Sequence, residues 1–194
     1  MSVPNTIHPL LQTRYSPLVF QDKPIPKDIL KRLFEAAQWA PSSYNEQPWR
    51  FVVGVKGEGN GWQKIFDCLV EGNQTWANSA PVLVLTVAKK SFAYNKADNP
   101  HAWHDVGLAM SQLIFQATSE QIFVHQMAGF DAQKARESLL IPDECEPVAV
   151  AALGYEGNIT DITDPKLVER ANAPRQRQSL SEIVFEDHFG NGLF

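Results

Sequence analysis

The chain has 194 residues, of which 44% are apolar and 20% charged, which is typical of one folded domain and too apolar for a disordered chain. The net charge of −5 gives no basic field, so we expect neither nucleic acid nor an anionic membrane as a partner. No apolar run approaches the roughly 20 residues that span a bilayer, and the first residues lack the pattern of a signal peptide. The two cysteines form no CxxC pair and have no histidine at metal spacing, so we expect a cytoplasmic protein without disulfides or a metal site.

The first dozen residues fit either a helix or an extended arm. Apolar residues then recur at three- and four-residue spacing between Lys27 and Ala40, with charged residues between them, and this predicts an amphipathic helix. Pro26 suits its first turn. The turn formers of residues 41–45 end it, and Phe51 to Val55 follows as a strand.

The middle of the chain predicts a short helix from Trp62 to Leu69, with residues 71–73 at or beyond its end. The run from Val82 to Ala88 is apolar without alternation, which indicates a central strand that is covered on both faces. Residues 104–118 are apolar nearly all round, so this helix should lie in the core or between subunits.

Toward the end, Asp131 is placed to cap a short helix that runs to Leu139, and Val148 to Leu153 is a second buried strand. A polar tail begins at Asn158. The strands and helices do not alternate regularly, so we expect an α+β fold rather than a doubly wound parallel sheet. Glycine-rich nucleotide-binding signatures are absent from the sequence.

The loop of residues 41–49, Pro-Ser-Ser-Tyr-Asn-Glu-Gln-Pro-Trp, is unusually rich in hydrogen-bonding side chains for a helix-to-strand connection. Its hydroxyls and amides, stiffened by two prolines, could bind the edge of a flat heterocycle. The alternative is an ordinary turn with serine and asparagine caps, and the residues alone favour neither interpretation.

Two other groups have a structural and a functional interpretation. Arg175 and Arg177 in the tail fit a solvated surface, but together with Arg14 and Ser16 they could clamp a phosphate if the two ends of the chain converge. His101 and His104 lie three residues apart before Asp105, yet no third metal ligand is marked, so capping or surface roles are favoured.

These segments, in this order, resemble the nitroreductase family of flavin mononucleotide (FMN) enzymes. The resemblance covers residues from about 14 to about 190 and rests on spaced blocks of sequence: Arg14 to Phe20, Ala37 to Phe51 (AQWAPSSYNEQPWRF), Asn73 to Pro81, Asp105 to Ala109, Met127 to Asp131, Ala151 to Tyr155 and Arg175 to Val184.

The resemblance implies a central, mostly antiparallel sheet flanked by helices in an intertwined homodimer, with FMN sites built from both chains. Residues 1–194 would form one FMN-binding domain, whose residues from about 158 to 194 extend onto the partner. The implied FMN-binding residues are Arg14, Tyr15, Ser16, Arg175 and Arg177 at the phosphate end, Pro41, Ser42, Ser43 and Asn45 from the partner chain, Gln47 as support, and Asn73, Ala128 and Gly129 near the flavin ring.

Two positions leave questions open. Gln74 competes with Asn73 for the place near the ring. The family often has a basic residue two positions after the serine, and Leu18 stands there in this chain, so one cation near the phosphate would be missing unless Lys23 replaces it. Tyr44, Trp103 and Phe123 could line the substrate face, although packing is the favoured role for such large aromatic residues.

The activity that the resemblance implies is hydride transfer from NADH or NADPH through flavin N5 to a nitro compound, a quinone or a similar small electron acceptor, by a ping-pong mechanism. The flavin carries this chemistry, and no catalytic side chain is expected. Alternatives are a protein that stores or senses FMN, and another flavin reaction on the same fold, such as reductive dehalogenation or flavin cleavage. The sequence identifies neither the physiological acceptor nor the preferred nicotinamide cofactor.

Overall fold

The computed structural model describes residues 7–194, whose contacts divide into two units, one that ends at Ile162 and one that begins at Thr163. The prediction of a single domain with an extension onto a partner chain stays a prediction. Part of the expected N-terminal helix or arm lies outside the described residues. The described part of it forms α1 (Pro9–Thr13).

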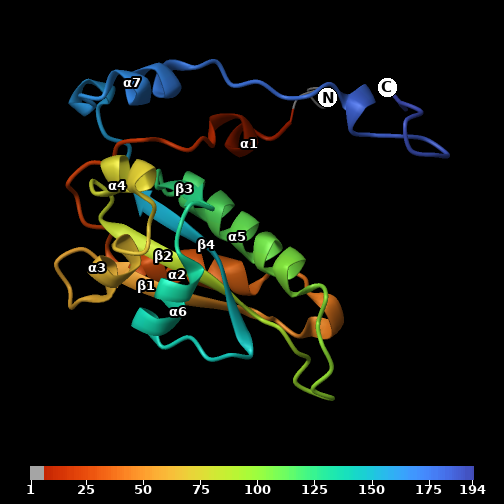
Figure 1. The fold of residues 1–194 in the computed structure, drawn as a ribbon. Coiled ribbons are helices and arrows are strands. Elements are labelled where there is room, and N and C mark those ends of the chain that lie inside the picture. Colours follow the sequence, from red (N-terminus) through yellow and green to blue (C-terminus); the bar gives the residue numbers. More distant parts are fainter. Residues whose placement is uncertain (1–6) are drawn as a thin grey trace. The chain divides into compact units, whose positions relative to one another are not determined.

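The first unit is an α+β structure around an antiparallel sheet, as the sequence predicts. Its strands lie in the order β1 (Trp49–Val55), β2 (Val82–Lys89), β4 (Cys145–Gly154) and β3 (Phe123–Met127). All three neighbouring pairs are antiparallel, with Val52 opposite Leu85, Leu85 opposite Val150 and Val124 opposite Leu153. Figure 1 shows this sheet between its helices.

The central position of β2 confirms the interpretation of its apolar run. Its alternate residues Val82 and Val84 join the main core with side chains of α2 (Lys27–Gln38) and α5 (Ala102–Ser119). Leu83 and Leu85 point to the opposite face and are fully buried there, where α3 (Gly61–Phe66) contacts the strand. A strand that is buried on both faces needs no polar alternation.

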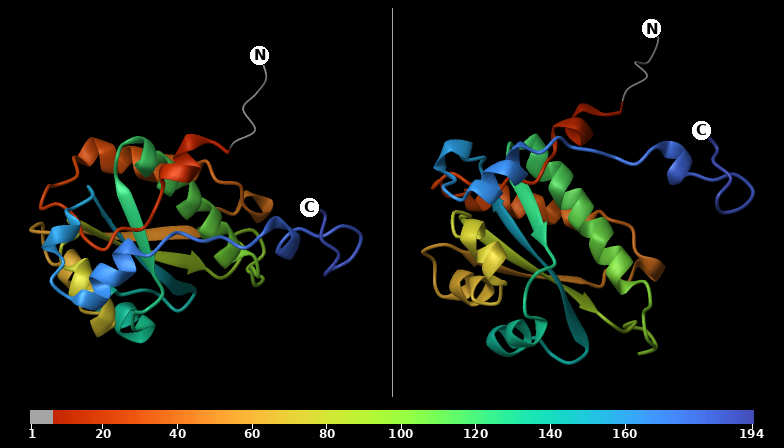
Figure 2. Two further views of the ribbon diagram at one scale, coloured as in Figure 1. Left: turned by 90° about the horizontal axis from the view of Figure 1, so that it is seen from above. Right: turned by 45° about the horizontal axis from the view of Figure 1, so that its top comes forward.

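Helices α2 and α5 pack against each other on one side of the sheet (Figures 1 and 2). Leu33 and Ala37 of α2 and Ala109 and Leu113 of α5 are fully buried, which confirms both predicted helices. At their far end, Arg32 of α2 donates two hydrogen bonds of 2.7 and 3.0 Å to the carboxylate of Glu120, the residue that caps α5.

Two elements differ from the sequence predictions. Residues 71–73, expected at or beyond a helix end, begin α4 (Glu71–Ala77), whose Trp76 is buried. Strand β3 was not predicted. It includes the polar His125, which is buried because its Nδ1 lies 2.7 Å from the carbonyl oxygen of Pro17 and its ring stacks on Trp76.

The glycine turn after β3 leads into α6 (Ala132–Leu139), which Asp131 caps as predicted by accepting a 2.9 Å hydrogen bond from the Lys134 N–H. The second unit contains α7 (Pro165–Asn172) and a short helical turn at Leu180–Glu182. That turn is closed by a capping box between Ser179 and Glu182. No helix in residues 7–194 is long and apolar enough to cross a membrane.

Candidate functional site

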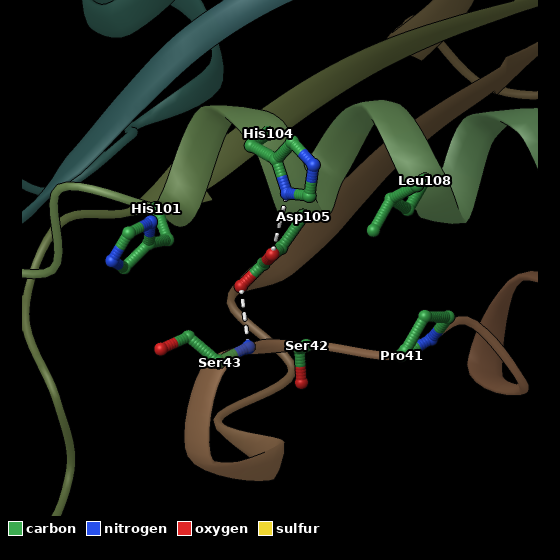
Figure 3. A pocket seen from close by; sticks show the side chains of 7 residues that line it. All are labelled: Pro41, Ser42, Ser43, His101, His104, Asp105 and Leu108. Atoms are coloured by element: carbon green, nitrogen blue, oxygen red, sulfur yellow. Dashed lines mark hydrogen bonds and ion pairs between the residues drawn. The ribbon is translucent and has the colours of Figure 1, made fainter. Parts of the chain in front are cut away.

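A cavity of about 300 Å³ lies between the loop that follows α2 and the beginning of α5 (Figure 3). Its walls are made by Pro41, Ser42, Ser43, His101, His104, Asp105 and Leu108. Three of these residues belong to the loop that the sequence singled out, so this part of the predicted site is a real concavity. Its volume is at the lower end of the range for small-molecule sites, which run from about 300 to 1,000 Å³.

The carboxylate of Asp105 holds the loop to the helix. Its side chain is 3% exposed. One oxygen, Oδ2, accepts a 3.0 Å hydrogen bond from the Ser43 N–H, and the other, Oδ1, lies 3.1 Å from Nδ1 of His104. A buried carboxylate is stabilised by such partners, and here they fix one side of the cavity.

The loop itself has an unusual backbone. Tyr44, Asn45 and Gln47 have φ values of 52°, 53° and 50°, in the left-handed region that non-glycine residues seldom occupy. The Gln47 N–H donates a 3.0 Å hydrogen bond to Ser42 Oγ, and the Gln47 amide lies 3.3 Å from Asn45 Oδ1. Gln47 is thus hydrogen-bonded within the loop, and neither Asn45 nor Gln47 lines the cavity.

The other side of this loop is held by Glu46. Its carboxylate accepts the Ala93 N–H at 2.9 Å and lies 3.4 Å from Lys89 Nζ. The ring of Tyr44 contacts Phe92 and Tyr94 at centroid distances of 5.7 and 5.9 Å, although Tyr44 itself is 81% exposed. The loop is therefore anchored on both sides, and its left-handed residues are held by contacts from two other segments.

A second group of predicted residues comes together where α4 meets the turn after β3. The Asn73 side-chain amide donates a 2.9 Å hydrogen bond to the Gly129 carbonyl, while Gln74 turns away to the Phe66 carbonyl. A Cβ on Gly129 would lie 2.8 Å from Asn73 Nδ2 and 2.9 Å from Val70 Cγ2. Gly129 is therefore required for the close approach of Asn73, and Ala128 beside it is exposed.

A third group lies between α1 and the sheet. Arg14 Nη1 is 3.5 Å from Ser16 Oγ, and the Tyr15 hydroxyl donates a hydrogen bond to Glu156 while its ring packs edge-on against Phe123. The aromatic packing role thus holds for Phe123. Arg14 and Ser16 are close enough to act on one anion.

Leu18 and Lys23, the two residues on which the question of a missing cation depends, have other contacts in the structure. Leu18 is buried in the core, so its side chain faces the protein interior. Lys23 Nζ lies 3.7 Å from the centre of the Tyr155 ring and is engaged in a cation–π contact. Arg175 and Arg177 are exposed in the second unit, and their convergence on Arg14 and Ser16 stays a prediction.

Sequence reasoning did not assign four of the cavity's lining residues to the site, and it favoured capping or surface roles for His101 and His104. His101, His104, Asp105 and Leu108 follow the three- and four-residue spacing of one helix face, and this was the available signal. Residues 7–194 contain no group of three or more histidine, cysteine or acidic residues that could hold a metal ion.

Known proteins resemble this chain in sequence and in structure. The model of the nitroreductase family matches residues 11–67 and 60–155. A Mycolicibacterium smegmatis protein described as "Uncharacterized 15.4 kDa protein in ask 5'region" is 32% identical over 74% of this chain and 99% of its own length. A Stenotrophomonas maltophilia protein described as "Putative NADH dehydrogenase/NAD(P)H nitroreductase" is 29% identical over 70% of this chain and 78% of its own.

The structural comparison extends over nearly the whole chain. A crystal structure described as that of an oxidoreductase containing FMN superposes with a TM-score of 0.90 at 32% identity, over 98% of this chain and 96% of the other. The family model covers well over half of the residues, and the fold and the spaced sequence blocks agree with it. The chain belongs to the nitroreductase family.

Proposed function

We propose that the protein is an FMN-dependent oxidoreductase that takes a hydride from NADH or NADPH and delivers it to a small acceptor such as a nitro compound or a quinone. The observation that carries this proposal is the anchored Pro41–Ser43 loop, held at a cavity by the buried Asp105 carboxylate in a chain of the nitroreductase family. The similar structure described as containing FMN, and the relative named as an NAD(P)H nitroreductase, support the cofactor and the reductant.

The residues present fit FMN in their chemistry. The cavity offers serine groups beside the apolar surfaces of Pro41 and Leu108, which suits a flat heterocycle with a polar edge. The amide of Asn73 and the backbone of Ala128 and Gly129 form a second polar edge, at which the absence of a Cβ on Gly129 allows Asn73 to lie close to the backbone. Arg14 and Ser16 offer a cation and a hydroxyl for a phosphate.

We propose that these three groups of residues come together at one FMN site only when two chains form a dimer. Asn73, Gly129, Arg14 and Ser16 do not line the cavity of the Pro41–Ser43 loop. A homodimer would let one chain supply the Asn73 and Arg14 groups, joined by Arg175 and Arg177, while its partner supplies the loop. Trp103 and Gly107 leave an exposed strip along α5 that suits such a contact.

When bound, FMN supplies the redox chemistry by accepting and releasing a hydride at N5. The chain's own residues bind and orient it. Donors near N5 and the pyrimidine edge, as proposed for Ala128, Gly129 and Asn73, stabilise negative charge where it develops, and the arginines hold the phosphate end. Because reductant and acceptor would use the same face in turn, we expect ping-pong kinetics.

The experiment is an anaerobic titration of the purified protein, followed by visible absorption. We expect a yellow protein whose flavin band is bleached by NADH or NADPH and restored by a quinone or nitroaromatic compound, with steady-state turnover when all are present. A colourless protein that takes up no added FMN would contradict the proposal. Reduction by NAD(P)H without turnover of any acceptor would instead indicate a flavin store or sensor.

A further inference from the structure

One wall of the cavity carries a histidine whose orientation is fixed by a buried acid. The His104 side chain is 70% exposed, whereas its neighbour Asp105 is 3% exposed, and the Nδ1–Oδ1 distance between them is 3.1 Å. Figure 3 shows the second ring nitrogen of His104 turned away from the carboxylate. One nitrogen is thus engaged by the protein and the other is available to a ligand.

The Asp105 carboxylate determines which ring nitrogen of His104 carries the hydrogen. An ionised carboxylate only accepts hydrogen bonds, so Nδ1 must carry a hydrogen to bond with Asp105. Nε2 is then a lone-pair acceptor in the neutral ring and an N–H donor in the protonated ring. The same orientation of a histidine by a carboxylate recurs in hydrolytic triads, where the free nitrogen moves the proton.

Asp105 also ties His104 to the proposed cofactor loop. Its second oxygen accepts the Ser43 N–H at 3.0 Å, so the histidine ring and the Pro41–Ser43 loop share one anchor. The distance between the ring and anything bound against that loop is therefore restricted by the structure, which a proton-transfer group requires.

No other side chain on the cavity wall is equally placed. The titratable groups that line it are His101, His104 and Asp105, all from the beginning of α5, while Pro41, Ser42 and Ser43 contribute none. In residues 7–194, the His101 side chain has no carboxylate partner, and Asp105 is committed to two contacts as an acceptor. Leu108 and Pro41 offer apolar surface for a ring.

We propose that His104, oriented by Asp105, is the acid that protonates the oxygen of a quinone-type acceptor that lies against the bound flavin beside this cavity. The inference rests on the proposed function. The hydride brings two electrons and one proton to the acceptor and leaves one oxygen anionic. That oxygen takes the proton from Nε2 of the imidazolium, which becomes neutral imidazole and is reprotonated by water at its exposed side. The acceptor alone is reduced in this step, and the reduced cofactor alone is oxidised.

The kinetic test separates the two half-reactions by stopped flow, with NADH as reductant and 1,4-benzoquinone as acceptor. In His104→Gln, whose exposed ring can be removed without unpacking the core, we expect reduction of the bound flavin to keep its rate. Reoxidation by the quinone should slow about 100-fold at low pH, the lower part of the range for general acid catalysis. In the parent protein this step should slow as pH rises, because the acid loses its proton, and in the variant the rate should not depend on pH in this way.

The matched control is His188→Gln, which removes an exposed histidine in the second unit, and it should keep the pH profile of the parent protein. A second measurement does not depend on turnover. Nitrogen-15 NMR of histidine-labelled, oxidised holoprotein should show neutral His104 with its hydrogen on Nδ1, and Asp105→Asn should abolish that preference.

The outcomes distinguish this inference from the proposed function. A loaded protein in which His104→Gln changes neither the rate nor the pH profile of reoxidation would overturn the inference alone, as would a neutral His104 with its hydrogen on Nε2. A protein that takes up no FMN would overturn both proposals.

Discussion

At the scale of single residues, polar side chains at the candidate site mainly hold nearby backbone segments in position. Asn73 holds the turn after β3 through the Gly129 carbonyl, and Asp105 holds the Ser43 N–H. Gln74 is instead hydrogen-bonded to the Phe66 carbonyl, and which of Asn73 and Gln74 meets the flavin stays a prediction. In both places, a short side chain fixes a backbone segment that is proposed to meet the cofactor.

A substitution at Gly129 tests whether the Asn73–Gly129 hydrogen bond positions the backbone that is proposed to bind FMN. Gly129→Ala would place a methyl group 2.8 Å from Asn73 Nδ2, so the amide must move and its hydrogen bond must lengthen or break. We expect FMN affinity to fall about tenfold, as for the loss of one hydrogen bond, measured by fluorescence titration. Gly72→Ala has no heavy atom within 4 Å of the new methyl and should leave the affinity unchanged. Equal affinities of the two variants would contradict the positioning role.

The left-handed loop makes a prediction about stability. Asn45 has a φ of 53°, which asparagine tolerates and a β-branched residue does not. Asn45→Val should lower the free energy of unfolding by about 1–2 kcal/mol, because the valine side chain collides with its own backbone in this region. Urea denaturation measures the change. Asn45→Gly serves as the control and should be nearly neutral, and a valine variant as stable as the glycine variant would show that this φ is not kept.

At the scale of elements, α2 and α5 are joined at one end by the Arg32–Glu120 ion pair, with Asp28 also bonded to Arg32 at 3.0 Å. The Arg32 guanidinium lowers the pKa of Glu120 and that of Asp28, and the carboxylates raise the pKa of Arg32. Carboxyl groups with a lowered pKa in the folded state stabilise it above their unfolded pKa values, near 4, and that stabilisation is lost as pH falls through the folded values.

Glu120→Gln should therefore lower the Tm at pH 7, and the difference from the parent protein should shrink as the pH falls below about 4. Differential scanning calorimetry between pH 3 and 7 measures both. Glu35→Gln removes a carboxylate from the exposed face of α2, where Lys31 lies at 3.5 Å, and should have a smaller effect at pH 7. A Tm difference that is independent of pH would exclude this ion pair as the cause.

The sequence predicted those helices and strands whose formation depends on their own local residues. The apolar spacing of α2, the continuous apolar run of β2 and the Asp131 cap of α6 each depend on local residues. Strand β3 and helix α4 gave no such signal, because Gly72 and Asn73 resemble a helix end and His125 interrupts the apolar residues of β3. These two elements are completed by tertiary contacts, the Asn73–Gly129 bond and the stacking of His125 on Trp76.

The candidate site was predictable to a similar degree. The unusual composition of residues 41–49 pointed to the loop, and the loop does border a cavity. The His104–Asp105 pair was harder to predict, because helical spacing does not show that the Asp105 carboxylate accepts a hydrogen bond from the distant Ser43 backbone.

At the scale of the whole molecule, the proposed FMN site requires two chains. Trp103, Gly107, Ser111 and Phe115 follow a four-residue spacing along α5, and none of them is fully buried in the single chain. A nearly apolar helix with such a strip suits a subunit contact better than solvent. The proposed division of the FMN site between chains makes this contact a condition of binding.

Gly107 tests the contact directly. Nothing lies within 4 Å of a Cβ at this position, so Gly107→Glu should be tolerated by the single chain and should still prevent close packing of a partner helix. We expect sedimentation velocity to show a dimer for the parent protein and a monomer for the variant. Gly72→Glu, at another open glycine, should remain a dimer. If Gly107→Glu sediments as a dimer like the parent protein, the subunit contact does not include this part of α5.

The most direct test of the central claim, that each FMN site is built from both chains, is a complementation experiment. Arg14→Glu replaces the cation that is proposed to bind the FMN phosphate, and Ser43→Trp fills the cavity beside the loop. Neither homodimer should therefore hold FMN. When the two variant chains carry different tags and are purified as a mixed pair, one site per pair regains both intact halves, and we predict that FMN binding and NADH-dependent quinone reduction return at half the parent level. A mixed pair that stays colourless while both variants remain folded and dimeric would contradict the account.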